Sequence, residues 1–497
     1  MTDILPFGPG AWVFITLYLA SLLLLGWAGR AARKEDTLQD FYLAGRGFGF
    51  VVLLLTLYAT QYSGNTFFGV AGATYRVGFG WLIAVHYMLA IIVFYLAFAP
   101  KLHNLSRSRG YVTPTDYLED RYQSKVVSLV GSIVMIIALS NYLLAQLMTM
   151  GRALQGLAGP NYGDEAYNYG VIGLALIMLI YGTLGGIRAI AWTDVIQGSI
   201  LMISFFVLLL LLFDQFGPLS AATEKIATST DAYKVARPNT AMLREWLSYI
   251  LILGMGGALY PHAIQRIYAA KSSRIMNRSL AMMAFMPFTT ALIAVIAGIY
   301  ALAYVPGLEG AATDQILARL LRIIQENSFI GYTVVVVIFS AVLAALMSTA
   351  DSAMLSISSM FTKDIYATHI NTHARQSKLT KTGKRCSWIV VSLLVFLALL
   401  LKNHTSLIAL IDRKFDVLVQ LVPAFMLGIH FQFLRSTPIL IGLIAGLIIA
   451  LGLAFGPFDF VVDGKLWGFH PGLYGLAVNT SIAVIGSTLN KAAALRN

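Results

Sequence analysis

The sequence predicts an all-α membrane protein that crosses the bilayer many times, and three observations support this fold class. Of the 497 residues, 58% are hydrophobic and 12% are charged, whereas a soluble domain of average composition carries about 25% charged residues. The apolar residues form long runs, and a helix needs about 20 of them to cross a hydrocarbon core. Two of these runs are interrupted near their middle by glycine and polar residues. The composition therefore excludes a soluble globular protein.

We predict about 13 transmembrane helices by this length criterion. The loops between them are too short to hold a folded soluble domain, so residues 1–497 are expected to form one membrane domain. The first run lacks a preceding basic segment and an A-x-A-type cleavage site, so we expect a retained helix and no signal peptide. The predicted spans lie near residues 11–29, 47–75, 78–102, 126–154, 168–186, 190–213, 246–269, 278–304, 329–361, 386–402, 411–432, 437–456 and 472–490.

The formal net charge of +12 does not indicate nucleic-acid binding, because the basic residues lie in short loops between apolar runs. In that position they indicate how the chain is oriented in the membrane. Lys and Arg gather after the first, third, seventh and ninth spans. The positive-inside rule then places the N-terminus outside the cell and the C-terminus in the cytoplasm, which requires an odd number of spans across the cell membrane. The single cysteine, Cys386, excludes an intramolecular disulfide.

Two spans are expected to be broken helices. The span 47–75 has a polar and glycine-rich middle at 60–66. Such a pair of interrupted spans at corresponding positions is the best sequence indication of a transporter site, and it predicts inverted repeats at 47–213 and 246–432. The alternative is that the glycines only allow close helix packing, since single Gly and Pro residues are common in membrane helices. The middle of the second interrupted span contains Gly254, Gly256, Gly257 and Pro261.

A polar stripe follows one face of the predicted span 329–361. Asp351 lies on the flank of this stripe, roughly 60° around the helix from Ser348. An ionisable residue inside a membrane marks a functional site by default, and hydroxyl and carboxylate oxygens suit a small hard cation. For any one serine, close helix packing is the alternative reading. The stripe consists of Ser348, Thr349, Ser352, Ser356 and Ser359.

With these features assembled, the chain resembles the sodium:solute symporter family. The resemblance implies a leucine-transporter-type 5+5 inverted repeat with broken core helices 1 and 6. It also implies one extra N-terminal helix at 11–29, extra C-terminal helices at 437–490, and secondary active uptake driven by Na⁺ in place of enzymatic activity. The stretches that carry it are YLAGRGFG at 42–49, GGIRAIAWTDVIQGSILM at 185–202, QRIYAAKS at 265–272 and AALMSTADSAMLSISSMFTKDIY at 344–366.

The resemblance also implies two cation sites. Aspartate at 351 departs from the serine that the family pattern leads us to expect, and this leaves coupling to a proton open, because two neighbouring carboxylates can share one. Asp194 could instead pair with Arg188 or with a cytoplasmic basic residue, while Arg266 is expected to snorkel or to pair with an acid rather than to touch the solute. The principal sodium site would use Ala59, Tyr62, Ala345, Ser348 and Thr349. A second site would use Asp194, Ser348, Asp351 and Ser352.

The solute pocket is expected at mid-depth between the second, third, fourth, seventh and eleventh spans. Tyr-Pro-His at 260–262 resembles carriers of monocarboxylates and pantothenate, and the start of a half-helix with His262 would then face a carboxylate. A hydrogen-bonded core histidine is the alternative for His262. The apolar third span argues against a hexose. The candidate solute-binding residues are Gln61, Asn65, Thr66, Tyr142, Gln146, Tyr260, His262 and Gln420.

The most favoured function is therefore sodium-coupled symport of a small organic solute, a monocarboxylate or a pantothenate-like acid, by alternating access. Three alternatives stay open at this point. The first is a sodium- or proton-coupled symporter for a proline-like amino acid, although Gln61 is an amide where proline carriers of the family have an acid. The second is a solute-sensing membrane module without net transport. The third is a membrane-embedded hydrolase that uses Asp194 and Asp351 as an acid pair, which no catalytic motif supports.

Overall fold

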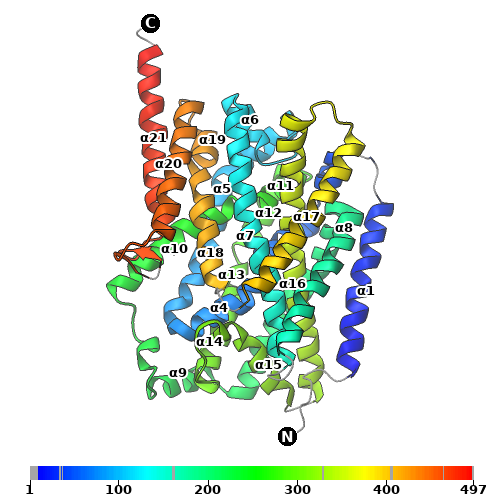
Figure 1. Ribbon diagram of the computed structural model, residues 1–497. Helices are drawn as coiled ribbons and strands as arrows, with labels where there is room; N and C mark the ends of the chain where they lie inside the picture. The colour runs from blue at the N-terminus through cyan, green and yellow to red at the C-terminus, as the bar shows by residue number, and fades with distance from the viewer. Residues whose placement is uncertain are drawn as a thin grey trace.

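The computed structural model describes residues 9–32, 35, 37–158, 163–326, 329–402, 407–462 and 464–494. Over these residues the chain is a bundle of long helices that run roughly along one common direction (Figure 1). One two-stranded antiparallel hairpin pairs β1, Val461–Val462, with β2, Lys465–Leu466. The prediction of an all-α protein is therefore confirmed. A helix satisfies every backbone hydrogen bond within its own segment, as a hydrocarbon environment requires.

The first half of the chain contains helices α1 to α8. The longest, α8, holds the two predicted spans 168–186 and 190–213, which are joined at Gly186. This residue has φ +62°, and a side chain there would place its Cβ 2.7 Å from the carbonyl oxygen of Phe41. Only glycine tolerates both conditions. The bounds are α1 Pro9–Ala31, α2 Leu38–Leu43, α3 Phe50–Gln61, α4 Gly64–Val77, α5 Ile83–Arg109, α6 Asp116–Tyr122, α7 Lys125–Ala158 and α8 Gly163–Phe216.

The second half contains α9 to α21. The bounds are α9 Leu219–Ala227, α10 Thr240–Ala258, α11 Pro261–Ala269, α12 Ser273–Met283, α13 Met286–Thr289, α14 Ala291–Tyr304, α15 Ile316–Glu326, α16 Phe329–Met360, α17 Gln376–Leu400, α18 Leu407–Leu418, α19 Gly428–His430, α20 Ser436–Phe455 and α21 Pro471–Ala494. Two π-helical segments continue α16 and precede α19, at Phe361–Ile370 and Pro423–Leu427. Short 3₁₀ turns occupy Ala44–Arg46, Gly78–Leu82, Ala232–Val235, Gly310–Gln315 and Val419–Leu421.

Within the described residues, eight helices are long and apolar enough to cross a membrane, or nine if one bent pair counts as a span. The number of 13 spans stays a prediction. The two counts differ partly because α8 merges two predicted spans and because α3 and α18 have 12 residues each. A length criterion leaves out such short halves of interrupted helices.

Both predicted interruptions are present. Helix α3 ends at Gln61 and α4 begins at Gly64, while α10 and α11 meet at an angle of 48°. The second break differs in detail from the expectation, because α10 runs through the glycine cluster and stops only at Ala258. Pro261 then occupies the first turn of α11, where its missing N–H costs nothing. The glycines instead allow close packing, since a Cβ on Gly257 would lie 2.7 Å from Ile91 Cδ1 of α5.

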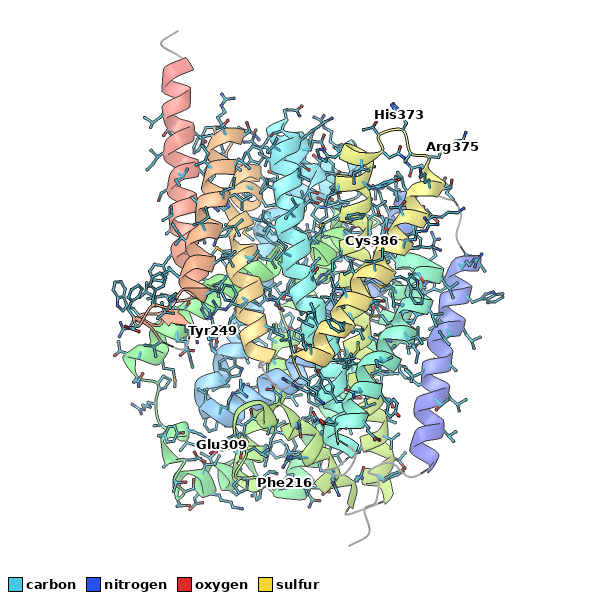
Figure 2. The ribbon with its side chains drawn as sticks, in the orientation of Figure 1. Phe216, Tyr249, Glu309, His373, Arg375 and Cys386 are labelled. Atoms are coloured by element: carbon cyan, nitrogen blue, oxygen red, sulfur yellow. The ribbon has the colours of Figure 1, made fainter. Side chains whose placement is uncertain are left out.

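The peripheral helices lie at opposite edges of the bundle (Figure 1). Helix α1 packs on α8, and α20 packs on α21 beside the hairpin. The first described residues of α1 and the last of α21 lie at opposite ends of the bundle, as an odd number of crossings requires. Figure 2 shows Phe216 and Glu309 near one end and His373 and Arg375 near the other. The basic loop and the C-terminus therefore share one end, and its assignment to the cytoplasm stays a prediction.

Candidate ion and solute site

Helix α16 lies in the interior of the bundle and carries the polar stripe. Its neighbours include α3, α7, α8, α11 and α17, and almost every residue from Val335 to Met360 is buried. A helix that is covered by protein on all sides can hold hydroxyl groups that a lipid-facing helix could not, because each hydroxyl finds a partner on a neighbouring helix. The side chains of Ser348, Thr349, Ser352, Ser356 and Ser359 are all buried.

The predicted principal ion site lies where α16 crosses the end of α3. The hydroxyl of Thr349 donates to the carbonyl oxygen of Ala59 over 3.2 Å and to that of Ala345 over 3.0 Å. The last carbonyl groups of a helix have no intrahelical partner, so the early end of α3 at Gln61 leaves the Ala59 oxygen available. Tyr62 caps α3 directly afterwards. The structure thus brings Ala59, Ala345 and Thr349 into contact and keeps Tyr62 beside them.

Close packing at the break holds α16 against this place. A Cβ on Gly64, the first residue of α4, would lie 2.1 Å from the Cδ2 atom of Leu346. No side chain larger than hydrogen fits there unless α4 or α16 moves, because interiors are packed with few voids. The glycine in the interrupted span therefore serves the close approach of α16 as well as the break itself.

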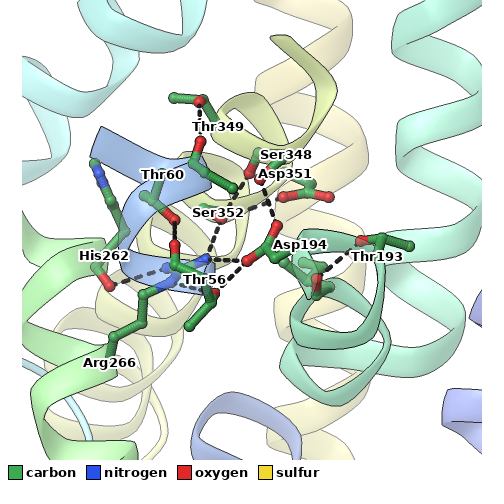
Figure 3. A network of polar contacts seen from close by, with 12 residues as sticks. Thr56, Thr60, Thr193, Asp194, His262, Arg266, Ser348, Thr349, Asp351 and Ser352 are labelled. Atoms are coloured by element: carbon green, nitrogen blue, oxygen red, sulfur yellow. Dashed lines mark hydrogen bonds and ion pairs between the residues drawn. The ribbon is translucent and has the colours of Figure 1, made fainter. Parts of the chain in front are cut away.

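Asp194 is the centre of a buried polar network that joins four helices (Figure 3). Its carboxylate accepts hydrogen bonds from the hydroxyls of Thr56 on α3 and Ser348 on α16. Arg266 on α11 forms an ion pair with it at 3.0 Å, and both side chains are almost fully buried. The same guanidinium donates to Ser352 Oγ over 2.6 Å and to Thr56 Oγ1 over 2.7 Å. The expectation that Arg266 pairs with an acid is thus met by Asp194.

Arg188, the other partner considered for Asp194, pairs with Asp40 instead, at 2.8 Å. Asp351 has a different environment from Asp194. It accepts a hydrogen bond from the hydroxyl of Tyr181 over 2.5 Å and one from Ser352 over 3.2 Å. Among the residues that the structure describes, no cationic side chain forms an ion pair with it. Of the two neighbouring carboxylates, one is therefore neutralised by an arginine and the other is held by hydroxyl groups.

A cavity of about 60 Å³ lies between α3, α4, α5, α7, α10 and α18. It is where the solute pocket was predicted, and four candidates contribute to its wall: Gln61, Thr66, Tyr142 and Tyr260. Most of the remaining wall is apolar or aromatic, for example Val70, Met88 and Ile91. A largely apolar site with a few polar groups is typical of small-molecule pockets.

Two further candidates lie directly behind this wall. Gln146 donates to the hydroxyl of Ser63 over 3.4 Å, and Ser63 itself lines the cavity. His262 stacks on Tyr260 with ring centroids 4.9 Å apart and on Tyr142 at 5.9 Å. Both ring nitrogens of this buried histidine lack a hydrogen-bond partner within the described part of the chain. The hydrogen bonds that the core-histidine alternative assumes are therefore not found among the described residues, and the role of His262 stays a prediction. The side chain of Asn65 lies outside the described residues.

Gln420 requires a correction, because the structure places it away from the cavity. Its side-chain amide donates to the carbonyl oxygens of Asp416 and Gly472, over 3.1 Å and 2.8 Å. Its own backbone carbonyl accepts from Asn479 over 2.6 Å. Gln420 thus joins α18 to α21. The reason is the 3₁₀ turn at Val419–Leu421, which rotates this position away from the direction that a continuous α-helix would give it.

The cavity wall also contains charged residues that the sequence analysis did not select. Asp412, Lys414 and Phe415 of α18 all line it. Lys414 is only 3% exposed, and its ammonium nitrogen lies 3.6 Å from the ring centroid of Tyr142. A signal was present, because two ionisable residues in a predicted span indicate a functional site.

Comparisons with known proteins show which family and which fold the chain resembles. The sequence profile of the sodium:solute symporter family matches residues 41–446. The chain is 26% identical over 370 residues to the sodium/pantothenate symporter of Haemophilus influenzae, which covers 74% of each protein. It is 25% identical over 399 residues to the osmoregulated proline transporter OpuE of Bacillus subtilis, covering 80% of this chain and 78% of that one. A solved structure of a Na⁺-coupled sialic acid symporter in a substrate-bound outward-open state superposes with a TM-score of 0.80 at 19% identity, covering 97% of this chain and 98% of that one.

Proposed function

The chain belongs to the sodium:solute symporter family, and from this premise we propose that it imports a small organic carboxylate together with Na⁺ by alternating access. As a member of this family it is a multi-pass membrane protein and a secondary transporter rather than an enzyme, with sodium as its coupling ion. The observation that carries the proposal is the contact between the end of α3 and α16, where the Thr349 hydroxyl meets the Ala59 carbonyl oxygen beside the solute cavity.

We propose that residues 47–213 and 246–432 form two inverted repeats within a single transporter domain, 1–497. Each begins with a broken span, α3–α4 in the first and α10–α11 in the second, and this correspondence supports the assignment. Helix α1, the extra N-terminal helix predicted at 11–29, and helices α20–α21 at 437–490 lie outside the repeats, at the edges of the bundle. The N-terminus would face the outside and the C-terminus the cytoplasm.

The first sodium ion would bind to neutral oxygens at the junction of α3 and α16. The carbonyl groups of Ala59, Tyr62 and Ala345 and the hydroxyls of Ser348 and Thr349 are hard ligands, which suit Na⁺ better than a transition metal. The hydroxyl of Thr349 already points at the Ala59 carbonyl oxygen. A rotation of this hydroxyl about its C–O bond would turn two hydrogen-bonded oxygens into two ligands for one cation.

A second cation, sodium or a proton, would bind at Asp351. Its carboxylate is buried and is held by Tyr181 and Ser352, while the neighbouring Asp194 is already paired with Arg266. A buried carboxylate is stabilised when a cation or a proton compensates its charge. Ser348 and Ser352 connect the two sites, because the Ser352 hydroxyl donates to the Ser348 carbonyl oxygen over 2.7 Å. Asp194 would then hold the network in place through its hydrogen bond with Ser348.

Transport would follow from the binding of ion and solute on the two broken helices. Sodium bound between α3 and α16 would stabilise the outward-open state, and the solute in the adjacent cavity would favour closure toward the outside. The ion would leave along the stripe on α16, where Ser356 donates to Gln265 over 2.5 Å and Gln265 donates to Ser359 over 2.7 Å. The energy available is about 2.3 kcal/mol for each charge that crosses 100 mV.

A symporter for a proline-like amino acid is the second candidate, and the similarity to a proline transporter favours it. A thermal-shift screen in detergent separates the two, with short monocarboxylates, pantothenate, proline and glucose tested with and without Na⁺. A true solute stabilises the folded state by about 2.7 kcal/mol at 100 times its Kd. We expect carboxylates to do so only with Na⁺. Stabilisation by proline alone would assign the second function, and uptake into proteoliposomes excludes a sensory module.

A further inference from the structure

We propose that Lys414 binds the carboxylate group of the transported solute, and that this solute is a monocarboxylate with a short hydrocarbon part. The inference rests on the proposed function, because it assigns an anchor and a size to the solute of the same symport cycle. Its starting point is a buried lysine on α18 at the wall of the cavity.

Lys414 contacts aromatic rings and no acid. Its ammonium nitrogen lies 3.6 Å from the ring centroid of Tyr142, 4.8 Å from that of Phe415 and 5.2 Å from that of Tyr260. Among the residues that the structure describes, none forms a hydrogen bond or an ion pair with this nitrogen. Aromatic faces attract a cation but do not accept the three hydrogen bonds that an ammonium group can donate. A buried ammonium in such a cage is stabilised further when an anion joins it.

The other charged residues of α18 have partners of their own. Asp412 faces His470, with 3.7 Å between its Oδ1 atom and the Nε2 atom of the imidazole. Arg413 pairs with Asp416 at 3.0 Å. Arg413 and Asp416 therefore compensate each other's charge, whereas Asp412, which lines the same cavity as Lys414, has an imidazole beside it. Among the charged residues of α18 that the structure describes, Lys414 is the one that forms no ion pair.

The cavity supplies a second feature that favours an anion. Ser63 and Thr66, at the start of α4, line it together with Lys414. The first N–H groups of a helix have no intrahelical partner, and the helix dipole places partial positive charge at that end. A carboxylate between Lys414 and the start of α4 would therefore receive an ammonium on one side and backbone N–H groups on the other.

The size and the lining of the cavity limit the rest of the solute. The cavity, of about 60 Å³, is larger than the roughly 10–15 Å³ that one water needs, so a small organic solute can enter it. The wall beyond the polar groups includes Val70, Met88, Ile91 and Leu253. A two- to four-carbon carboxylate, roughly four to six non-hydrogen atoms, fits this space and this chemistry.

The first arm of the test uses the wild-type protein in lipid nanodiscs with Na⁺, and it measures Kd by titration calorimetry. Propionate is compared with propionamide, which has nearly the same shape and no charge, and with glycine, a zwitterion of similar size. We expect propionate to bind at least tenfold more tightly than either. Equal binding of propionamide would overturn the proposal, and so would preferred binding of glycine. Pantothenate binding as tightly as propionate would overturn the size limit.

The second arm uses K414M, which removes the charge and keeps the length of the side chain, and K414R, which keeps the charge. K402M is the matched control. Lys402 lies just after the C-terminal end of α17 and pairs with Asp164 at 3.1 Å. We expect K414M to weaken propionate binding at least tenfold, K414R to weaken it less, and K402M to leave it unchanged. An unchanged Kd in K414M would contradict the proposal.

The failure of this inference differs from that of the proposed function. If the wild type takes up a solute with Na⁺ but binds propionate and propionamide equally, the proposed symport is supported and the proposed role of Lys414 is contradicted. If no solute binds in a sodium-dependent manner, both fall. The wild-type arm decides the question even if K414M fails to fold.

Discussion

The hydroxyl of Thr349 lies 3.2 Å from the carbonyl oxygen of Ala59 and donates a hydrogen bond to it. The two residues are 290 positions apart in the sequence and belong to α16 and α3. Their contact exists because α3 stops at Gln61 and exposes its last carbonyl groups, and because Gly64 lets α16 approach the break. An ion that binds here would therefore link α3 with α16 directly.

Because Arg266 and Asp194 form a buried ion pair, we expect substitutions of the two residues to change the free energy of unfolding strongly and non-additively. R266Q leaves a buried carboxylate without its cation, which costs about 3–5 kcal/mol in the free energy of unfolding. The double variant D194N/R266Q removes both charges and is expected to recover most of this loss. R188Q is the control, because Arg188 pairs with Asp40 nearer the surface and its loss should cost less. Thermal unfolding in nanodiscs measures all four proteins. A double variant no more stable than R266Q would contradict the pairing.

If Asp351 binds the second cation, its substitution changes the number of cations that accompany each solute. Because D351N removes the charge but keeps a similar shape, the variant is expected to move one positive charge fewer per solute and to retain sodium dependence through Thr349. The measurement is the reversal potential of solute flux in proteoliposomes, with imposed Na⁺ and proton gradients to identify the ion.

D364N is the matched control for this experiment. Asp364 is a buried aspartate further along the same helix, and it accepts hydrogen bonds from Thr113, Thr115 and Ser132. Its replacement should leave the ratio of charge to solute unchanged. If the reversal potential of D351N equals that of the wild type, the second cation site is ruled out.

The close approach at Gly64 predicts a position-specific packing effect. G64A places a methyl group against Leu346 and is expected to destabilise the fold by about 1–3 kcal/mol, as overpacking does. G173A on α8 is the control, because a Cβ there meets nothing within 4 Å. L346A should be less harmful in combination with G64A than the sum of the single effects predicts. Strict additivity of the two changes would show that the helices do not meet here.

Membrane orientation can be tested with single cysteines. In a C386S background, E309C and R375C place one thiol at each end of the bundle, where both native residues are exposed. The positive-inside rule predicts that an impermeant maleimide labels E309C on intact cells and labels R375C only after permeabilisation. The reverse pattern would invert the topology and with it the proposed direction of sodium release.

Much of the architecture followed from the sequence, and particular residues explain where the prediction stopped. The broken helices could be predicted, because Gly64 and Pro261 interrupt runs that are otherwise apolar. The break in α10–α11 falls at Pro261 and not at the glycine cluster, since glycine allows a helix to continue when tight packing supports it. Tyr142 and Tyr260 could be predicted as cavity residues from their position in spans that flank the breaks.

The charged residues were harder to place. Arg266 and Asp194 are 72 positions apart, and no local pattern states that they meet. The position of Gln420 was predicted wrongly because the 3₁₀ turn at Val419–Leu421 changes the helical phase after Leu418. Lys414 was overlooked because a lysine near the end of a span is ordinarily read as a topology signal. In the folded protein Lys414 is instead buried against Tyr142, which a role in topology alone does not explain.

The most direct test of sodium-coupled symport is uptake of labelled propionate into proteoliposomes under an inward sodium gradient. Wild type, S348A, T349A and S340A are compared. Ser340 is a buried serine of α16, and among the described residues its hydroxyl bonds only within its own helix, to Val336 over 2.8 Å. We expect the wild type and S340A to concentrate propionate only with the gradient. S348A and T349A should need roughly tenfold more Na⁺ for half-maximal uptake, which corresponds to the loss of about 1.4 kcal/mol of ion binding. Accumulation without a sodium gradient, or unchanged sodium dependence in both S348A and T349A, would contradict the account.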